Sequence, residues 1–516
     1  MDRFRMNRRR LVQAGALGAG AAFFAGRMPS SGVAAQGTPQ KGGTLRVGRA
    51  GDFVHFDPFF AVTVNLPMYR QLYNTLVVYD EKLNVQPQLA ESWEYSDDKL
   101  SLVFHLRKGV TFHNGRDFTA DDVVKNVQRA QDASLSHSML GYTKPISDIK
   151  AVDPATVQFT FSEPANGIWD FLTVMGIVAP EAFEAPAITK PIGTGPFKFV
   201  SWNPGQEATF QKYEGYWEEG LPYLDEVVVK ALPDQQAAIA NLEGGELDIV
   251  QGVPLNDIPR LKTSDSITLN NGVDAVQFYT LYCNVARPPF DNEKVRQAFA
   301  HAIDQQTIVD TVLFGVGKAS DTPFPEWSLA YDASLVDYLP FDLDKAKALL
   351  AEAGHGDGLE TTVITTSEAA EQRGMAQIIQ SDLAKIGVKL NIKDISSADW
   401  NQVWPAKDYD LMISAAGFSQ KDPSTLFNSM SGFRLDDNRT NFSTPQYSEF
   451  VTTTAGLTDP QERHDKYVEL AKYMIEQANA NVISFKYIVF GVRNNVNDLT
   501  LQLDDDMDLG RVWLAK

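Results

Sequence analysis

Apolar and polar residues alternate through residues 100–107, LSLVFHLR, and this period of two predicts a strand with one buried face. The Lys-Gly pair at 108–109 predicts a turn, and residues 110–112 predict a second short strand. The Asn-Gly pair at 114–115 is typical of a tight turn. The stretch therefore reads as strand, turn, short strand and turn in immediate succession.

A helix is predicted directly after this second turn. Thr119 is placed to cap its N-terminus, and Asp121 and Asp122 fall in the first turn, where carboxylates suit the exposed N–H groups. The helix needs one apolar stripe to pack against the sheet. That stripe is supplied by Val123, Val124 and Val127.

Strand and helix patterns alternate along the rest of the chain. A strand, a helix and a strand at 361–366, 369–386 and 388–394 suit a βαβ crossover, with Gly387 just after the helix. Other predicted strands are at 44–47, 157–161, 197–212 (as a hairpin), 227–231, 247–250, 411–415, 482–485 and 488–492. Other predicted helices are at 65–76, 235–243, 292–303, 343–353 and 463–478. The pattern predicts an α/β protein.

Charge and length narrow the class of protein. The chain has 516 residues and a net charge of −20, so we expect more than one structural unit and no nucleic-acid partner. Its only cysteine, Cys283, lies in an apolar run and is predicted to be a buried, inert thiol.

No motif for catalysis or metal binding is found. The sequence lacks a P-loop, HExxH, GxSxG or a paired cysteine motif, and His105 and His113 have no third ligand nearby. Gly193 and Gly195 precede no helix, so they are interpreted as backbone requirements rather than phosphate ligands. We therefore expect no enzyme activity, no cofactor and no metal, with an exported hydrolase as the alternative from another class.

The first 35 residues have the composition of an export signal. They hold six Arg, no Lys and one Asp, and Arg8, Arg9 and Arg10 resemble a twin-arginine motif ahead of a mildly apolar Ala- and Gly-rich segment. Small residues at 33–35 suit cleavage before Gln36. The alternative is an uncleaved membrane anchor. No cysteine is near, so lipid attachment is excluded.

Several blocks resemble one known family. Residues 89–123 hold the pattern LAESWEYSDD…FHLRKGVTFHNGRDFTADDV, residues 193–217 hold GTGPFKFVSWNPG followed by Tyr-Trp, and residues 281–304 hold NVARPPFDNEKVRQAFAHAID. These resemble the family 5 extracytoplasmic solute-binding proteins, the dipeptide- and oligopeptide-binding components of ATP-binding-cassette (ABC) importers. The blocks follow the order of that family.

The resemblance implies a two-lobed periplasmic-binding-protein fold with hinged lobes and an extra small α+β subdomain. We expect a signal segment at 1–35 and a linker at 36–43. The first lobe is expected at 44–75, 188–272 and 488–516, the inserted subdomain at 76–187, and the second lobe at 273–487. Such a protein captures a small polar solute between its lobes and delivers it to a permease.

The solute would contact residues from both lobes. Candidates are aromatic walls and directed polar groups at loop and helix starts. They are Phe53, Thr63, Asn65, Trp400, Trp404, Phe418, Ser419 and Asp422. Core packing is the alternative for the two tryptophans, and a loop position without a role is the alternative for Phe53 and Thr63.

Peptide-binding members of the family place an aspartate shortly before a D-P or E-P dipeptide, where it pairs with the peptide's α-ammonium group. Here Asp422 and Pro423 align with that dipeptide, and Ser419 stands where the aspartate is expected. A serine cannot supply the charge, and an unpaired buried ammonium costs several kcal/mol. An oligosaccharide, an opine-like compound or a metal chelate is therefore a rival to a peptide.

The sequence thus predicts a periplasmic or extracellular transport protein. Its partners would be a small-molecule solute and the membrane permease subunits of an ABC importer. We expect a monomer. A receptor or chaperone role on the same fold remains an alternative.

Overall fold

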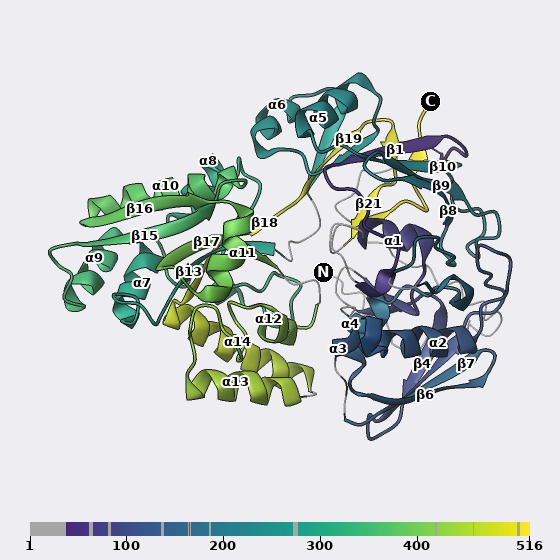
Figure 1. Ribbon diagram of the computed structural model, residues 1–516, viewed down its shortest axis with the longest axis horizontal. Coiled ribbons are helices and arrows are strands. Elements are labelled where there is room, and N and C mark those ends of the chain that lie inside the picture. Colours follow the sequence, from purple (N-terminus) through teal and green to yellow (C-terminus); the bar gives the residue numbers. More distant parts are fainter. Residues whose placement is uncertain are drawn as a thin grey trace, which may run out of the picture. The chain divides into compact units, whose positions relative to one another are not determined.

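The fold contains two large β-sheets with different strand orders, and a smaller sheet is formed by strands within residues 90–161 (Figure 1). The computed structural model describes residues 38–60, 66–80, 84–135, 139–163, 165, 167–184, 187–271, 277–417, 421–457, 459–502 and 506–516. All of these belong to one compact unit. The predicted signal segment, residues 1–35, lies outside the described residues.

The first sheet has seven strands, in which β1 pairs in parallel with both β10 and β11. Its outer strands pair antiparallel. The order is β12 (Ile267–Asn271), β19 (Val489–Arg493), β11 (Ile249–Gln251), β1 (Thr44–Arg49), β10 (Glu226–Ala231), β9 (Glu207–Lys212) and β8 (Phe197–Asn203). The late strand β19 thus returns to the sheet begun by β1, as the sequence predicted.

The second sheet has six strands, and its helix-linked pair β15 and β16 is parallel throughout. The predicted βαβ crossover is confirmed, and Gly387 follows the helix with φ +86°. The order is β14 (Lys318–Ala319), β18 (Ala480–Lys486), β13 (Gln277–Cys283), β17 (Leu411–Gly417), β15 (Leu359–Thr366) and β16 (Val388–Ile395). The chain passes between the two large sheets from β12 to β13 and again from β18 to β19.

The small sheet contains the alternating stretch from which the sequence analysis began. Its strands are β4 (Ala90–Tyr95), β5 (Ser101–Leu106), β7 (Thr156–Phe161) and β6 (Ile146–Asp153), in that order. Leu102, Phe104 and Leu106 are buried, so the period-two prediction is confirmed. Three two-stranded ladders complete the sheets: β2 (Val77–Tyr79) with β3 (Val85–Pro87), β20 (Val496–Asn497) with β23 (Trp513–Leu514), and β21 (Thr500–Gln502) with β22 (Asp506–Asp508).

Helices connect the strands and cover the sheets. Among the described helices, none is long and apolar enough to cross a membrane. The α-helices are α1 (Leu66–Leu72), α2 (Ala120–Ala130), α3 (Leu140–Thr143), α4 (Ile168–Val174), α5 (Gln235–Gly244), α6 (Ile258–Leu261), α7 (Glu293–His301), α8 (Gln305–Thr311), α9 (Leu343–Glu352), α10 (Ala370–Lys385), α11 (Ser397–Ala406), α12 (Ser424–Ser429), α13 (Pro445–Gly456) and α14 (Pro460–Gln477). Short 3-10 turns lie at Pro58–Phe60, Ala133–Leu135, Pro180–Ala182, Leu255–Asp257 and Ala333–Leu335.

Separate apolar cores form on these sheets. The first core joins β1, β10 and the small sheet to α2 and α4. Two further cores cover opposite faces of the second sheet, and β13 contributes to both because it is central there: Phe278 and Tyr282 enter one, Tyr279 and Leu281 the other. Cys283 is fully buried beside the latter pair, so its predicted burial is confirmed, and burial raises its pKa to about 12, which disfavours the reactive thiolate.

Two predicted elements differ most from the structure. Residues 110–112 form only an isolated bridge, between Thr111 and Asp117, because the turn follows too closely for a ladder. The helix predicted at 65–76 ends at Leu72, because the N–H of Gly195 takes the Leu72 carbonyl at 2.9 Å. A Cβ on Gly195 would lie 2.5 Å from a carbonyl oxygen of the same helix, so this glycine is a backbone requirement, as predicted.

Candidate functional site

The candidate site residues follow the carboxyl ends of parallel strands in both large sheets. The loop after β1 carries Phe53, and β1 lies between the parallel strands β10 and β11. In the second sheet, β15 is parallel to both β16 and β17; Trp400 and Trp404 follow β16, while Asp422 follows β17. In open α/β sheets, ligands bind outside the carboxyl ends of the strands. The candidate residues that the structure describes thus follow such strand ends in two different sheets.

Phe53 points into the first core rather than into solvent. Its side chain is 4% exposed, and its ring lies 5.0 Å from Phe56 and 6.1 Å from Phe210, measured between centroids. The Arg49 guanidinium lies 5.1 Å from the centre of the Phe53 ring. These contacts make Phe53 a wall of the core beneath the loop, and they leave its predicted role in ligand contact untested.

Charged residues lie at the end of β1 and in the loop that follows it. Burial lowers the pKa of Arg49 to about 10, against the nearby charge of Asp52. The Asp52 carboxylate accepts hydrogen bonds from the indole of Trp202 at 3.2 Å and from the N–H of Gly205 at 2.6 Å. Burial also lowers the pKa of His55, which favours its neutral form. The loop is thereby fixed to the β8–β9 hairpin before any solute arrives.

Trp400 and Trp404 share one face of α11, as their spacing predicted. Their rings stack with centroids 5.8 Å apart and planes 17° apart. The Trp404 indole is 6% exposed and donates to Ser431 Oγ at 3.0 Å. The Trp400 indole N–H, by contrast, is buried without a hydrogen-bond partner among the described residues. Trp404 therefore packs as a core residue, and Trp400 is the outer member of the stack.

Asp422 already has partners for both carboxylate oxygens. Oδ2 accepts from the Arg463 guanidinium of α14 at 2.7 Å, and Oδ1 accepts from the N–H of Ser424 at 3.0 Å. The Lys421 ammonium beside it lies 5.5 Å from the centre of the Trp327 ring. The segment after β17 thus presents a paired carboxylate next to a cation.

The same segment contacts the helix α4, far from it in the sequence. The backbone N–H of Asp422 donates to Asp170 Oδ2 at 2.9 Å. The Tyr79 hydroxyl donates to the other oxygen of Asp170 at 2.8 Å. Asp170 is 4% exposed, and burial together with the charge of Asp422 raises its pKa to about 6. A buried carboxyl therefore joins the first core to the candidate site of the second sheet.

Half of the predicted site lies outside the described residues. These positions are Thr63, Asn65, Phe418 and Ser419. The sequence reasoning did not identify Lys421, Asp170, Tyr79 or Arg463. Lys421 could have been found by its charge beside the Asp-Pro pair, whereas the pairing of Asp170 with Asp422 spans 252 positions and left no local signal.

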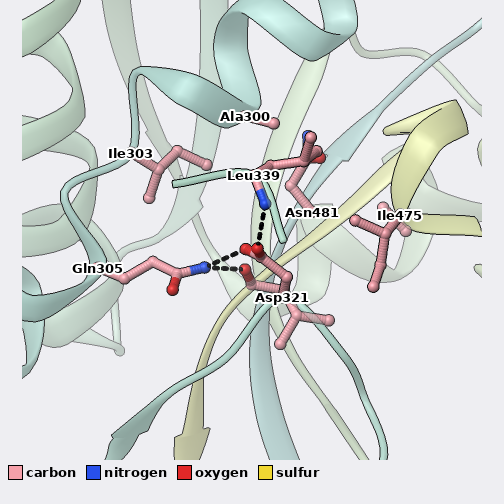
Figure 2. A pocket seen from close by; sticks show the side chains of 9 residues that line it. Ala300, Ile303, Gln305, Asp321, Leu339, Ile475 and Asn481 are labelled. Carbon is pink, nitrogen blue, oxygen red and sulfur yellow. Dashed lines mark hydrogen bonds between the residues drawn. The ribbon is translucent and has the colours of Figure 1, made fainter. Parts of the chain in front are cut away.

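A small cavity beneath β18 lies apart from this site (Figure 2). Asp321 is its acidic residue, and Figure 2 shows Gln305 donating to Oδ1 and the N–H of Leu339 donating to Oδ2, at 2.8 and 2.7 Å. The other walls include Ile303 and Ile475. Its carboxylate is thus bonded within the protein. Among the residues that the structure describes, no cluster of His, Cys, Asp or Glu is arranged to hold a metal ion.

Comparison with known proteins identifies relatives over most of the chain. The family model for bacterial extracellular solute-binding proteins, family 5 (Middle), matches residues 84–434. Heme-binding protein A of Haemophilus influenzae is 32% identical over 450 residues, covering 79% of this chain and 80% of that protein. The glutathione-binding protein GsiB of Salmonella choleraesuis is 29% identical over 443 residues, covering 81% and 84%.

A solved structure agrees with the sequence relatives. The structure of AgaA from A. tumefaciens R10, in complex with agropinic acid, superposes with a TM-score of 0.73 at 28% identity, covering 92% of this chain and 99% of that one. The match extends over both large sheets. The two-lobed α/β fold predicted from the sequence is therefore confirmed.

Proposed function

Because this chain belongs to the bacterial extracellular solute-binding proteins of family 5, we propose that it captures a small polar solute between two lobes and delivers it to the permease of an ABC importer. The relatives named above are binding proteins, which supports capture without chemical conversion. Capture needs contacts from both lobes that form together. We infer that residues at the carboxyl ends of the parallel strands in the two large sheets make these contacts.

We propose that the lobes follow the division expected from the sequence. The first lobe would comprise 44–75, 188–272 and 488–516 around the first sheet, with the inserted subdomain 76–187 around the small sheet. The second lobe would comprise 273–487. The two crossings between the large sheets support this division, because a chain that crosses only twice leaves a natural hinge. Limited proteolysis within 272–276 and 487–488 tests it: of the three resulting fragments, the first and the third should stay associated, and the middle one should form a separate stable unit.

The solute would differ from an ordinary peptide with a free amino terminus. The observation that carries this proposal is the Asp422 carboxylate, whose oxygens are bonded by Arg463 and Ser424 at 2.7 and 3.0 Å. An ammonium group placed there would have to displace a guanidinium, because one carboxylate cannot neutralise both charges. A solute that brings no ammonium to this point avoids that cost.

Carboxylate-bearing solutes are candidates because relatives of this chain bind compounds of that chemistry. Opine-like acids and the carboxylates of a glutathione-like peptide have this chemistry, and AgaA and GsiB bind compounds of these kinds.

Native mass spectrometry of the purified protein, followed by thermal melting against a panel of solutes, tests the function. The panel contains dipeptides, glutathione, heme, an opine acid, oligosaccharides and metal chelates. A solute at about 100 times its Kd stabilises the folded state by about 2.7 kcal/mol. We expect shifts from amine-free or carboxylate-rich solutes.

Two results would contradict the proposal. Shifts caused by simple dipeptides would show that an ammonium is accommodated, and the Asp422→Asn variant, losing those shifts, would identify Asp422 as its partner. Turnover of ester, peptide or glycoside substrates, with no solute bound, would favour the exported hydrolase instead.

We further propose that the protein is exported by its twin-arginine segment and acts as a monomer. Arg8→Lys with Arg9→Lys should retain the chain in the cytoplasm, because the export pathway reads the arginine pair as an address. Cleavage before Gln36 is read from the N-terminus of the exported protein. Size-exclusion chromatography with light scattering should give the mass of one chain.

A further inference from the structure

One buried carboxyl connects two parts of the fold that are distant in the sequence. Asp170 lies on α4, whose apolar residues Ile168, Phe171 and Leu172 belong to the first core. Its Oδ2 accepts a hydrogen bond from the backbone N–H of Asp422. Asp422 immediately precedes Pro423 and the helix α12, which follow strand β17 of the second sheet. This hydrogen bond, 2.9 Å long, fixes the position of the Asp422 backbone relative to α4.

The side of Asp170 that faces the first core is also bonded. Tyr79, at the end of β2, donates its hydroxyl to Oδ1 at 2.8 Å. Burial and the neighbouring Asp170 raise the pKa of Tyr79, so its hydroxyl stays a donor. Asp170 is therefore held by its own core and reaches from there to the segment that carries the candidate site.

The groups facing Asp170 carry both signs of charge. Asp422 is negative and Lys421 positive, and Arg463 of α14 holds the Asp422 carboxylate at 2.7 Å. Burial and then the charge of Asp422 raise the pKa of Asp170 to about 6, although the Asp422 N–H, Tyr79 and Lys421 act in the opposite direction. The bonded arrangement therefore holds the Asp170 proton more tightly than water-exposed aspartate does.

The sign of the pH effect follows from this difference. Opening of the contact would expose Asp170 to water and move the charge of Asp422 away, which reduces the two largest causes of its raised pKa. The closed contact binds the proton better, so it is strengthened as pH falls from about 6 to about 4. Well above pH 6, Asp170 is ionised in both states and the strength of the contact no longer changes.

We propose that Asp170 is a positioning residue that fastens the segment Lys421–Pro423 to α4, and that protonation of Asp170 strengthens this attachment. The consequence for solute capture rests on the proposed function, because the fastened segment would then form one wall of the binding site. The attachment itself does not depend on which solute binds.

Distances between spin labels on the full-length, solute-free protein test the attachment. One label replaces the exposed Ser162, beside the small sheet, and the other replaces the exposed Thr453 on α13. Cys283 does not compete for the label because it is buried and its pKa is raised to about 12. Molecules in which the contact is formed should show a short distance between the labels, and molecules in which it is open a longer one. The ratio of the two populations is measured at pH 8 and at pH 5.

In the wild-type protein we expect this ratio to rise by up to about tenfold from pH 8 to pH 5. Asp170→Asn keeps the size and an acceptor oxygen without the charge, so its ratio should be high at both pH values. Asp170→Ala loses the acceptor, so its ratio should be low at both. Circular dichroism confirms that each variant is folded.

Asp321→Asn is the matched control. Burial raises the pKa of Asp321 to about 6 as well. Its partners Gln305 and Leu339, however, belong like Asp321 itself to the part of the chain between β13 and β18, so its hydrogen bonds do not link that part to α4. This variant should keep the wild-type response to pH. A folded Asp170→Ala variant with an unchanged ratio, or a wild-type ratio equal at both pH values, would overturn the proposal. A failed solute search would leave these distances unaffected, so the two proposals are tested separately.

Discussion

Two arginine–carboxylate pairs lie near the candidate site, and they differ in how they are enclosed. Arg129 and Asp57 are 2.6 Å apart with side chains 8% and 0% exposed, between the rings of Phe59 and Phe183. Arg463 and Asp422 are 2.7 Å apart, and both side chains are 12% exposed. The first pair is sealed inside one core, whereas the second adjoins the contact with Asp170.

This difference indicates which segment is held rigidly and which can move. The Asp57 carboxylate also accepts N–H groups from Phe59 and Ile188, at 3.0 and 3.3 Å, so its loop cannot move without breaking several bonds. Around Asp422, one backbone hydrogen bond reaches across to Asp170. We therefore expect the loop after β1 to determine stability and the segment before α12 to determine solute capture.

Arg129→Ala should have the largest effect on this comparison. It leaves the fully buried Asp57 charge unpaired, which is expected to lower the free energy of unfolding by about 3–5 kcal/mol. Urea denaturation followed by circular dichroism measures it. Lys389→Ala, which removes an exposed surface pair with Glu360, is the control and should leave the urea midpoint nearly unchanged. Similar losses in both variants would contradict the sealed character of the Asp57 pair.

Phe53→Ala should come next, with a loss of about 3 kcal/mol. The side chain is 4% exposed and contacts two aromatic rings, so its removal opens a cavity in the first core. Phe53→Leu, which retains most of the volume, should lose less. If thermal unfolding stays unchanged while solute binding disappears, Phe53 is a ligand contact and not a core residue.

Arg463→Ala should destabilise the protein less than Arg129→Ala, by about 1–3 kcal/mol. Water still reaches part of this pair, so the charge left on Asp422 is partly hydrated. The same urea series measures the difference, and the Arg463→Ala/Asp422→Ala double variant serves as its control because it leaves no unpaired charge. A loss as large as that of Arg129→Ala would mean that both pairs are equally sealed.

Trp400→Phe should have the smallest effect on stability, below about 1 kcal/mol. Its indole N–H has no partner among the described residues, so no hydrogen bond is lost. Trp404→Phe, which loses the bond to Ser431, should cost about 1–2 kcal/mol and is the matched comparison. A reduced solute-induced melting shift in Trp400→Phe alone would assign Trp400 to the site.

Local pattern predicted many elements of this fold, although not all of them; β6 and α13 were missed. The alternation at 100–107 produced β5, Thr119 capped α2, and the spacing around α10 produced a parallel βαβ unit, because each depends on neighbours within a few residues. The ends of helices and strands were harder to predict. Leu72 ends α1 because the distant Gly195 takes its carbonyl, and no local residue carries that information.

The sequence by itself determined the family, the two-sheet α/β fold and the place of Trp400, Trp404 and Asp422 after the second sheet's strands. Tertiary structure alone decided what those residues touch. It enclosed Phe53 and Trp404 in cores, paired Asp422 with Arg463, and brought Asp170 to the Asp422 backbone. Periodicity reports which face of an element is buried, whereas a hydrogen bond across 252 positions depends on how whole elements pack, which no local pattern encodes.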